Sequence, residues 1–189
     1  MRRNNENLVD EITMIKEMIM PPENVDENAS NEEKMIHNIL SKAYYCCARK
    51  EYDKAFNLYL KAANKGDASA QFNIGKLYLY GHGIKQDYKK AFEWFKKAAE
   101  QGNAQAEFQL GEMYEFGRGV ENDDNKAFYW YKRSAKQQYS NAQYYLGRVY
   151  SEGRIGISIN LQKASEWFRK AAGNGNEVAS LELKRLGEP

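Results

Sequence analysis

Residues 68–103 read ASAQFNIGKLYLYGHGIKQDYKKAFEWFKKAAEQGN, and this stretch decides the fold because it recurs. Residues 104–139, AQAEFQLGEMYEFGRGVENDDNKAFYWYKRSAKQQY, repeat its pattern, and residues 140–176 repeat it again with one extra residue in the loop. Four residue types keep their places: Trp94, Trp130 and Trp167; Gly75, Gly111 and Gly147; Tyr78, Tyr114 and Tyr150; Ala91, Ala127 and Ala164. A repeat of this length predicts a stack of supersecondary units.

Each unit is predicted to form two helices, and the first of them occupies about residues 68–80. Ala70, Ile74 and Leu77 recur at the spacing of one helix face, which indicates a helix that packs on one side. Gly81 comes directly after this pattern, and a residue without a Cβ atom readily adopts the left-handed conformation that caps a helix.

The second helix is predicted over about residues 87–101, and Asp87 stands where an N-cap residue belongs. Asp123 and Asn160 take the same place in the next two units. Small residues let the helices approach closely at Ala70, Gly75, Ala91 and Ala98. Because the three tryptophans recur with the same period as these small residues, we expect the tryptophan rings to lie in the core between helices rather than to form a ladder that stacks on a ligand.

The repeats extend in both directions. Residues 31–67 carry the same pattern with a loop two residues shorter, and residues 177–189 match only a first helix, with Lys184 where the close-packing glycine would stand. We therefore expect an all-α, right-handed superhelical solenoid of antiparallel helix pairs over residues 31–189. It would comprise about four helix pairs, in units of about 31–67, 68–103, 104–139 and 140–176, and a terminal capping helix.

The recurring pattern A-x-A-x-x-x-L-G-x-x-Y-x-x-G-x-G-V-x-x-D-x-x-K-A-x-x-W-x-x-K-A-A-x-x-G resembles the Sel-one-like repeat family, a relative of the tetratricopeptide repeats. Residues 68–139 follow it closely, apart from Gln138 where the closing glycine belongs, and Ser165 departs from it in the third unit. The resemblance implies a scaffold or regulator of protein complexes. It also implies a variant role as an inhibitor or immunity-type protein that sequesters a partner enzyme.

The composition argues against several classes of function. With 28 Lys and Arg against 26 Asp and Glu, the formal net charge of +2 provides no basic excess for nucleic acid. No apolar run approaches the roughly 18 residues of a membrane-spanning helix, and the first residues lack the apolar core of a signal peptide. The two cysteines, Cys46 and Cys47, are adjacent and cannot build a disulfide framework, which favours a reducing, cytoplasmic compartment.

The sequence contains no motif that predicts catalysis, a cofactor or a metal. Gly81 and Gly83 lack the preceding strand and the third glycine of a phosphate-binding loop. The two histidines, His37 and His82, lie in different units without a cluster of metal ligands. We expect core thiols rather than a nucleophile at the paired cysteines, because no histidine stands near them in the sequence. An enzyme is therefore the least favoured class.

The first 30 residues differ from the repeats. Residues 21–33 have the composition of a linker. Before it, four aliphatic residues share one face of a predicted amphipathic helix: Leu8, Ile12, Ile15 and Ile19. This helix is expected to cap the solenoid, to dock in its own groove or that of a second copy, or to lie on a membrane surface; acidic residues on its polar face disfavour the last. Self-association through residues 8–20 would make a self-assembling structural protein the alternative function.

In the tetratricopeptide geometry the first helices line the concave face, so their solvent-facing positions are candidates for a binding surface. These candidates are Ser69, Phe72, Lys76, Leu79 and Tyr80 in one unit, Gln105, Phe108, Glu112, Glu115 and Phe116 in the next, and Asn141, Tyr144, Arg148, Ser151 and Glu152 in the third. Lys76, Glu112 and Arg148 alternate in charge at one position and would set the register of a peptide. The sequence thus predicts a cytoplasmic, non-catalytic adaptor, scaffold or regulator that binds a protein or peptide, with neither cofactor nor metal.

Overall fold

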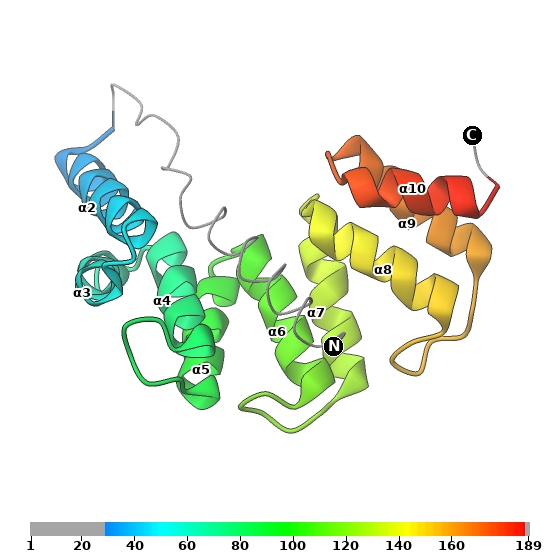
Figure 1. Cartoon of the computed structure of the whole chain (residues 1–189), viewed down its shortest axis with the longest axis horizontal. Helices are drawn as coiled ribbons and strands as arrows, with labels where there is room; N and C mark the ends of the chain where they lie inside the picture. The colour runs from blue at the N-terminus through cyan, green and yellow to red at the C-terminus, as the bar shows by residue number, and fades with distance from the viewer. Residues whose placement is uncertain (1–28, 188–189) are drawn as a thin grey trace. The chain divides into compact units, whose positions relative to one another are not determined.

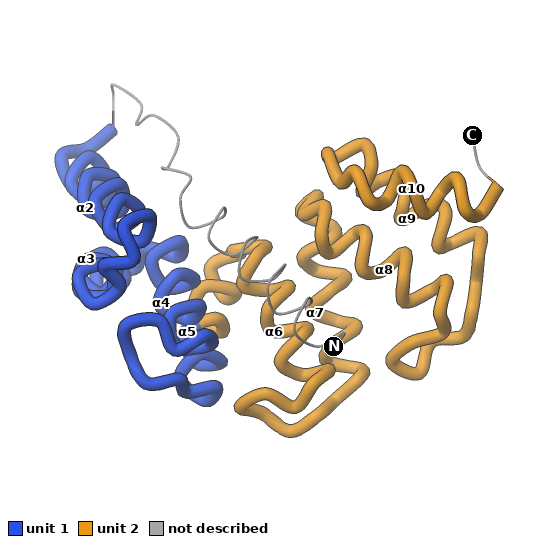
Figure 2. Tube along the Cα trace, in the orientation of Figure 1, with its two compact units in different colours: residues 1–94 blue, residues 95–189 orange. Residues whose placement is uncertain are grey.

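The computed structural model describes residues 29–187. The chain divides into two compact units, residues 1–94 (unit 1) and residues 95–189 (unit 2), which Figure 2 shows in different colours. The described part of the chain consists of helices and the loops that join them, without a strand. The amphipathic helix predicted over residues 8–20 lies outside the described residues.

Unit 1 contains α2 (Asn31–Ala48), α3 (Tyr52–Ala63), α4 (Ala68–Tyr80) and the first half of α5 (Tyr88–Glu100). Helix α3 packs against both α2 and α4 (Figure 1). Their shared core consists of Leu40, Ala43, Cys47, Ala55, Tyr59, Ala62, Ala63, Ala70, Ile74 and Leu77. Burying a large aliphatic or aromatic side chain of this kind contributes about 1.5–3 kcal/mol, so the packing of the three helices on one another stabilises the unit.

Helix α2 begins earlier than the composition of its first turn suggests. Ser30 accepts a hydrogen bond from the backbone N–H of Glu33, and the Glu33 carboxylate accepts one from the backbone N–H of Ser30. This capping box satisfies two backbone donors that the helix itself leaves without acceptors. Helix α2 therefore begins at Asn31, the first residue of the first predicted unit, although residues 31–33 have the composition of a linker.

Unit 2 contains the second half of α5 and then α6 (Ala104–Phe116), α7 (Asp124–Lys136), α8 (Ser140–Glu152), α9 (Leu161–Gly173) and α10 (Glu177–Arg185). From α6 onward each helix packs against the next one in the chain (Figure 1). Lys184, which takes the place of a close-packing glycine, is exposed on the terminal helix α10. The helices that pack on one another within each unit, and the absence of a strand among residues 29–187, make the protein an all-α repeat solenoid, as the sequence predicts.

The predicted helix ends are confirmed. Left-handed glycines cap the first helices at Gly81 (φ 72°), Gly117 (φ 62°) and Gly153 (φ 70°). The side chain of Asp87 accepts a hydrogen bond from the backbone N–H of Lys90 at 3.0 Å, so it caps α5. Asp123 caps α7 and Asn160 caps α9 in the same way.

The tryptophans lie at the edge of the core rather than inside it. Trp94 and Trp167 are half-buried and pack against the outside of buried clusters. The deeply buried ring belongs to the residue that directly follows each tryptophan. Tyr131 follows Trp130 and is 0% exposed, and Phe168 follows Trp167 and is 1% exposed. One residue turns the side chain by about 100° around a helix, and it is this following position that points at the first helix of the same unit.

Candidate functional site

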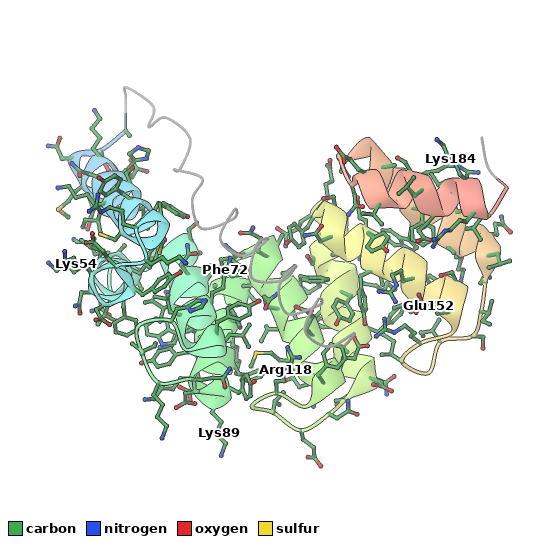
Figure 3. The ribbon with its side chains drawn as sticks, in the orientation of Figure 1. Lys54, Phe72, Lys89, Arg118, Glu152 and Lys184 are labelled. Carbon is green, nitrogen blue, oxygen red and sulfur yellow. The ribbon has the colours of Figure 1, made fainter. Side chains whose placement is uncertain are left out.

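The fifteen predicted binding positions lie on three first helices. Helix α4 of unit 1 carries five of them, and helices α6 and α8 of unit 2 carry the other ten. The positions in unit 2 lie on two helices of the same compact unit, so their geometry can be compared directly. Figure 3 marks Phe72 on α4 and Glu152 at the end of α8.

In unit 1 most of the predicted positions are buried. Phe72, Lys76 and Leu79 are only 5%, 3% and 5% exposed. The Nζ atom of Lys76 lies 5.3 Å from the centre of the Phe72 ring, within the range of a cation–π contact. Ser69 and Tyr80 are half-buried, and the Tyr80 ring stacks near His82. The α4 positions therefore form a covered face rather than an open one.

In unit 2 the carboxylate of Glu115 is the centre of a polar cluster. It accepts hydrogen bonds from the hydroxyl of Tyr131 at 2.7 Å and from the hydroxyl of Tyr145. Arg154 donates from Nη2 to the other carboxylate oxygen at 2.7 Å. The Glu115 side chain is 7% exposed, and a carboxylate buried to this extent needs such partners. The cluster thus joins α6, α7, α8 and the loop that follows α8.

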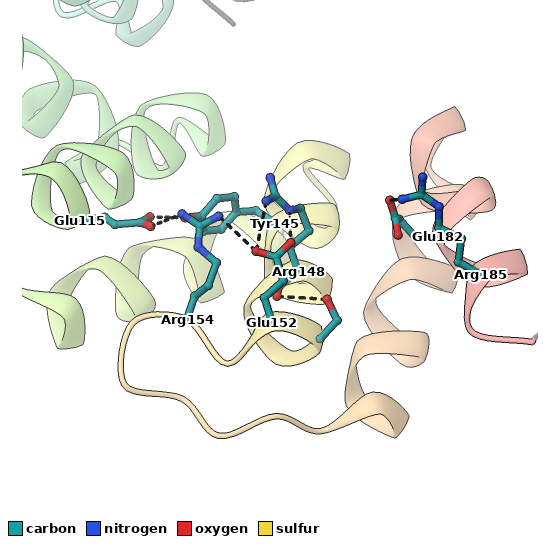
Figure 4. Close-up of polar contacts among 8 residues, drawn as sticks. Glu115, Tyr145, Arg148, Glu152, Arg154, Glu182 and Arg185 are labelled. Atoms are coloured by element: carbon teal, nitrogen blue, oxygen red, sulfur yellow. Dashed lines mark hydrogen bonds and ion pairs between the residues drawn. The ribbon is translucent and has the colours of Figure 1, made fainter. Parts of the chain in front are cut away.

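The cluster continues to the surface through the loop arginine (Figure 4). Arg154 Nη1 lies 3.8 Å from a carboxylate oxygen of Glu152. Arg148 binds Glu152 with two hydrogen bonds, at 2.8 and 3.2 Å. The side chains of Arg148 and Glu152 are 37% and 43% exposed. A charged pair that faces solvent is therefore held in place by a buried anchor.

The two tyrosines of the cluster remain protonated. Burial, followed by the negative charges of nearby carboxylates, raises the pKa of Tyr131, and burial together with the hydrogen bond to Glu115 raises the pKa of Tyr145. Both hydroxyls act as hydrogen-bond donors to Glu115. The rings lie 4.3 Å apart between their centres. This arrangement fixes positions, which suits recognition more than proton transfer.

The other predicted positions of unit 2 divide into packed and open ones. Phe108 packs against the rings of Tyr131, Tyr139 and Tyr145 and so belongs to the framework. Phe116 is 50% exposed, and the guanidinium of Arg118 lies over its ring. The remaining positions of the set are half-buried: Gln105, Glu112, Asn141, Tyr144 and Ser151.

Sequence reasoning missed Arg154, Tyr131 and Tyr145. Arg154 follows the capping glycine of α8, inside the loop that carries the extra residue. Its contact with Glu115 spans 39 residues of sequence, and the contact of Tyr145 with Glu115 spans 30. The one available signal was the loop insertion, which marks this unit as different from the other two.

A second buried carboxylate was also missed. Glu107 on α6 is fully buried, and Arg133 Nη2 lies 2.7 Å from its Oε1 atom. The side-chain amide of Gln137 donates to Oε2 at 2.7 Å. Burial raises the pKa of Glu107 in spite of the opposing effect of Arg133. These contacts join α6 to the end of α7 and stand apart from the predicted surface.

Each unit also has a shallow hollow on its surface. One, of about 320 Å³, lies in unit 1 beside Tyr52 and Gly83, and the other, of about 480 Å³, lies in unit 2 beside Gln143 and Trp167. Among residues 29–187, no three His, Cys, Asp or Glu side chains gather where they would hold a metal ion. None of the helices in this range is long and apolar enough to cross a membrane.

Comparison with known families and structures gives a consistent result. A family model described as Sel1 repeat matches four consecutive segments, residues 42–67, 68–103, 104–139 and 140–176. No curated protein is significantly similar to the chain. Among solved structures, a Sel1 repeat protein from Oxalobacter formigenes is 42% identical, with a TM-score of 0.60 over 67% of this chain and 95% of its own.

Two further structures are similar at lower identity. The antigen c5321 of uropathogenic Escherichia coli, described as protective and as displaying an SLR fold, is 29% identical with a TM-score of 0.65. The similarity covers 77% of this chain and 36% of the antigen. Helicobacter pylori cysteine rich protein B is 26% identical with a TM-score of 0.54, over 70% of this chain and 93% of its own.

Proposed function

Because the chain belongs to the Sel1 repeat family, we propose that it is a non-catalytic adaptor that binds a protein or peptide through the first helices of its repeats. Proteins of this family generally mediate protein–protein interactions and are generally non-catalytic. The surface of α6 and α8 in unit 2 is the part that we assign to partner binding. The free thiols of Cys46 and Cys47 suit a reducing, cytoplasmic setting for this adaptor.

One observation carries the proposal: the part-exposed ion pair of Arg148 and Glu152 contacts Arg154, and the buried carboxylate of Glu115 holds Arg154 in place. Side chains that are already ordered lose less conformational entropy when a partner binds. The exposed ring of Phe116 adds an aromatic contact of the kind that dominates interface energetics. The surface therefore offers an ordered pair of charges on α8 and an exposed aromatic ring on α6.

A charge exchange tests this assignment. The double variant Arg148→Glu and Glu152→Arg keeps an ion pair between these two positions but inverts the charges that a partner meets. It also sets two positive charges close together, because Arg154 Nη1 lies 3.8 Å from the Glu152 carboxylate in the wild type; since these groups reach solvent, we expect a loss of stability of no more than about 1 kcal/mol. A partner isolated from the native host by affinity capture should bind the variant at least about tenfold more weakly, a difference of about 1.4 kcal/mol, as measured by calorimetry.

The matched control exchanges an exposed ion pair on a second helix. Lys96 and Glu100 of α5 lie 3.9 Å apart, four residues apart in the helix like Arg148 and Glu152, and are not among the predicted positions. The variant Lys96→Glu with Glu100→Lys should bind the same partner with unchanged affinity. Equal affinity of the wild type and the α8 exchange would refute the assignment, and equal weakening by both exchanges would indicate a nonspecific charge effect.

A further inference from the structure

One face of α4 is more deeply buried than the same face of the two later first helices. It carries Phe72, Asn73 and Lys76, which are 5%, 2% and 3% exposed. The residues at the same positions are half-buried in α6, where they are Phe108, Gln109 and Glu112, and in α8, where they are Tyr144, Tyr145 and Arg148. The three helices hold equivalent places in their repeats. Tyr44 of α2 contacts Asn73, which accounts for part of the extra burial, and the burial of Phe72 and Lys76 calls for a further explanation.

The chemistry of this face restricts what can cover it. Phe72 offers an apolar ring, and the ammonium group of Lys76 lies over that ring. Lysine side chains are almost never fully buried unless they are paired, because an ammonium group taken out of water needs a compensating charge or hydrogen bonds. A segment that covers this face should therefore combine aliphatic side chains with a carboxylate.

We propose that residues 8–20 of the same chain occupy the face of α4 that carries Phe72, Asn73 and Lys76. The segment has both required features. Its aliphatic residues Leu8, Ile12, Ile15 and Ile19 recur at the spacing of one helix face, and its acidic residues are Asp10, Glu11 and Glu17. The aliphatic stripe packs on Phe72, and one of the carboxylates pairs with Lys76.

The length of the intervening chain permits this placement. Residues 21–30 separate the segment from α2, and an extended chain of this length spans about 33 Å. Along α2, Tyr44 lies about 20 Å from the first residue, Asn31, at 1.5 Å per residue. The hydroxyl of Tyr44 accepts a hydrogen bond from Asn73 Nδ2 at 3.3 Å, so a linker of this length is long enough to bring the segment to the level of this face.

The occupied face has a regulatory consequence. A tethered segment acts at an effective concentration of about millimolar, so a partner that uses α4 must displace it before binding. The predicted binding positions Phe72 and Lys76 would then be inaccessible to a partner until that partner displaces residues 8–20. This inference concerns the protein without a partner, and it can fail while the assignment of α6 and α8 stands.

Zero-length crosslinking of the full chain tests the contact directly. A carbodiimide joins a lysine amine to a carboxylate only when the two touch, with the loss of one water molecule. We expect an amide between Lys76 and one of Asp10, Glu11 or Glu17, identified by mass spectrometry of the digested protein. The variant Lys76→Arg keeps the charge but removes the reactive amine, and it should lack this product. Crosslinks from Lys76 to other carboxylates alone would overturn the proposal.

Amine acetylation of the full chain provides a second measurement. Lys76 should react far more slowly than Lys89, which is exposed on α5 (Figure 3). The variant Ile12→Asp with Ile15→Asp should raise the Lys76 rate by at least about tenfold, since the rate follows the population of the open form. The control Asn4→Asp with Asn5→Asp adds the same charge outside the segment and should leave the rate unchanged.

Three outcomes would contradict the proposal. Lys76 reacting as fast as Lys89 in the wild type would show that the face is open. Protection that persists in the Ile12→Asp and Ile15→Asp variant would show that something else covers the face. When isotopically heavy and light chains are mixed, crosslinks between them would identify a second copy as the occupant, whereas crosslinks confined to one chain support the proposal.

Discussion

The ring of Tyr131 lies directly on the backbone of Gly111. A Cβ atom added to Gly111 would come within 2.6 Å of ring carbons Cδ1 and Cε1 of Tyr131. The next unit repeats this relationship, because a Cβ atom on Gly147 would lie 2.5 Å from the ring of Phe168. Glycine is therefore a packing requirement in the first helices of these two units, and the ring of the second helix occupies the space that a side chain would take.

This packing predicts the effect of one added methyl group. The variant Gly111→Ala should be less stable than the wild type by about 1–3 kcal/mol, the usual cost of overpacking a core. Urea unfolding followed by circular dichroism measures the difference. Gly173 is the matched control because a Cβ atom there would meet nothing within 4 Å. The variant Gly173→Ala should be more stable by up to about 1 kcal/mol, and a loss of stability in both variants would show that the Tyr131 contact is not the cause.

The same two residues show what the sequence could predict of the fold. A glycine recurs at the position of Gly111 in the three units between residues 68 and 176, so its role as a point of close approach could be predicted from the repeat alone. The ring that meets it could not, because Trp130 and Tyr131 recur with the same period. Periodicity gives the spacing of a pattern but not which of two adjacent residues faces the neighbouring helix.

The candidate site also contains some residues that the sequence predicts and others that it does not. Glu115, Arg148 and Glu152 were predicted as surface positions, and the structure brings them into one connected cluster. Arg154 was not predicted, since its partner Glu115 lies 39 residues earlier. Local spacing cannot reveal an interaction over this separation. The burial of Lys76 was missed for a related reason, because the pattern within α4 resembles that of the later first helices.

Removing the buried carboxylate of the cluster should destabilise unit 2. The variant Glu115→Ala leaves two tyrosine hydroxyls and Arg154 without their acceptor, and each buried polar group stranded in this way costs about 1–3 kcal/mol. Thermal or urea unfolding measures the loss. Glu152→Ala removes a carboxylate that is 43% exposed and should cost no more than about 1 kcal/mol. Equal losses from both variants would argue against Glu115 as the anchor.

The paired cysteines should react at very different rates. Burial raises the pKa of the Cys47 thiol to about 11, so only about 0.1% of it is thiolate at pH 8, and the thiolate is the reactive form. Cys46 is half-buried. Titration of the native protein with a chromogenic disulfide reagent should therefore show one fast thiol and one slow thiol. The fast phase should vanish in Cys46→Ser and persist in Cys47→Ser, and two equal rates in the wild type would contradict the burial of Cys47.

The buried carboxylate of Glu107 should make stability fall as the pH rises. Below the unfolded pKa of about 4.3 the group is protonated in both states, and as the pH rises the unfolded chain ionises first because burial raises the native pKa. Ionisation therefore favours unfolding until the pH passes the native pKa. In urea unfolding at pH 4 and pH 7, Glu107→Gln should gain stability relative to the wild type at the higher pH.

Glu51 is the opposite control, because hydrogen bonds from Lys54 and Arg49 lower its pKa. The variant Glu51→Gln should lose stability relative to the wild type as the pH rises, and the same trend in both variants would disprove the assigned role of burial.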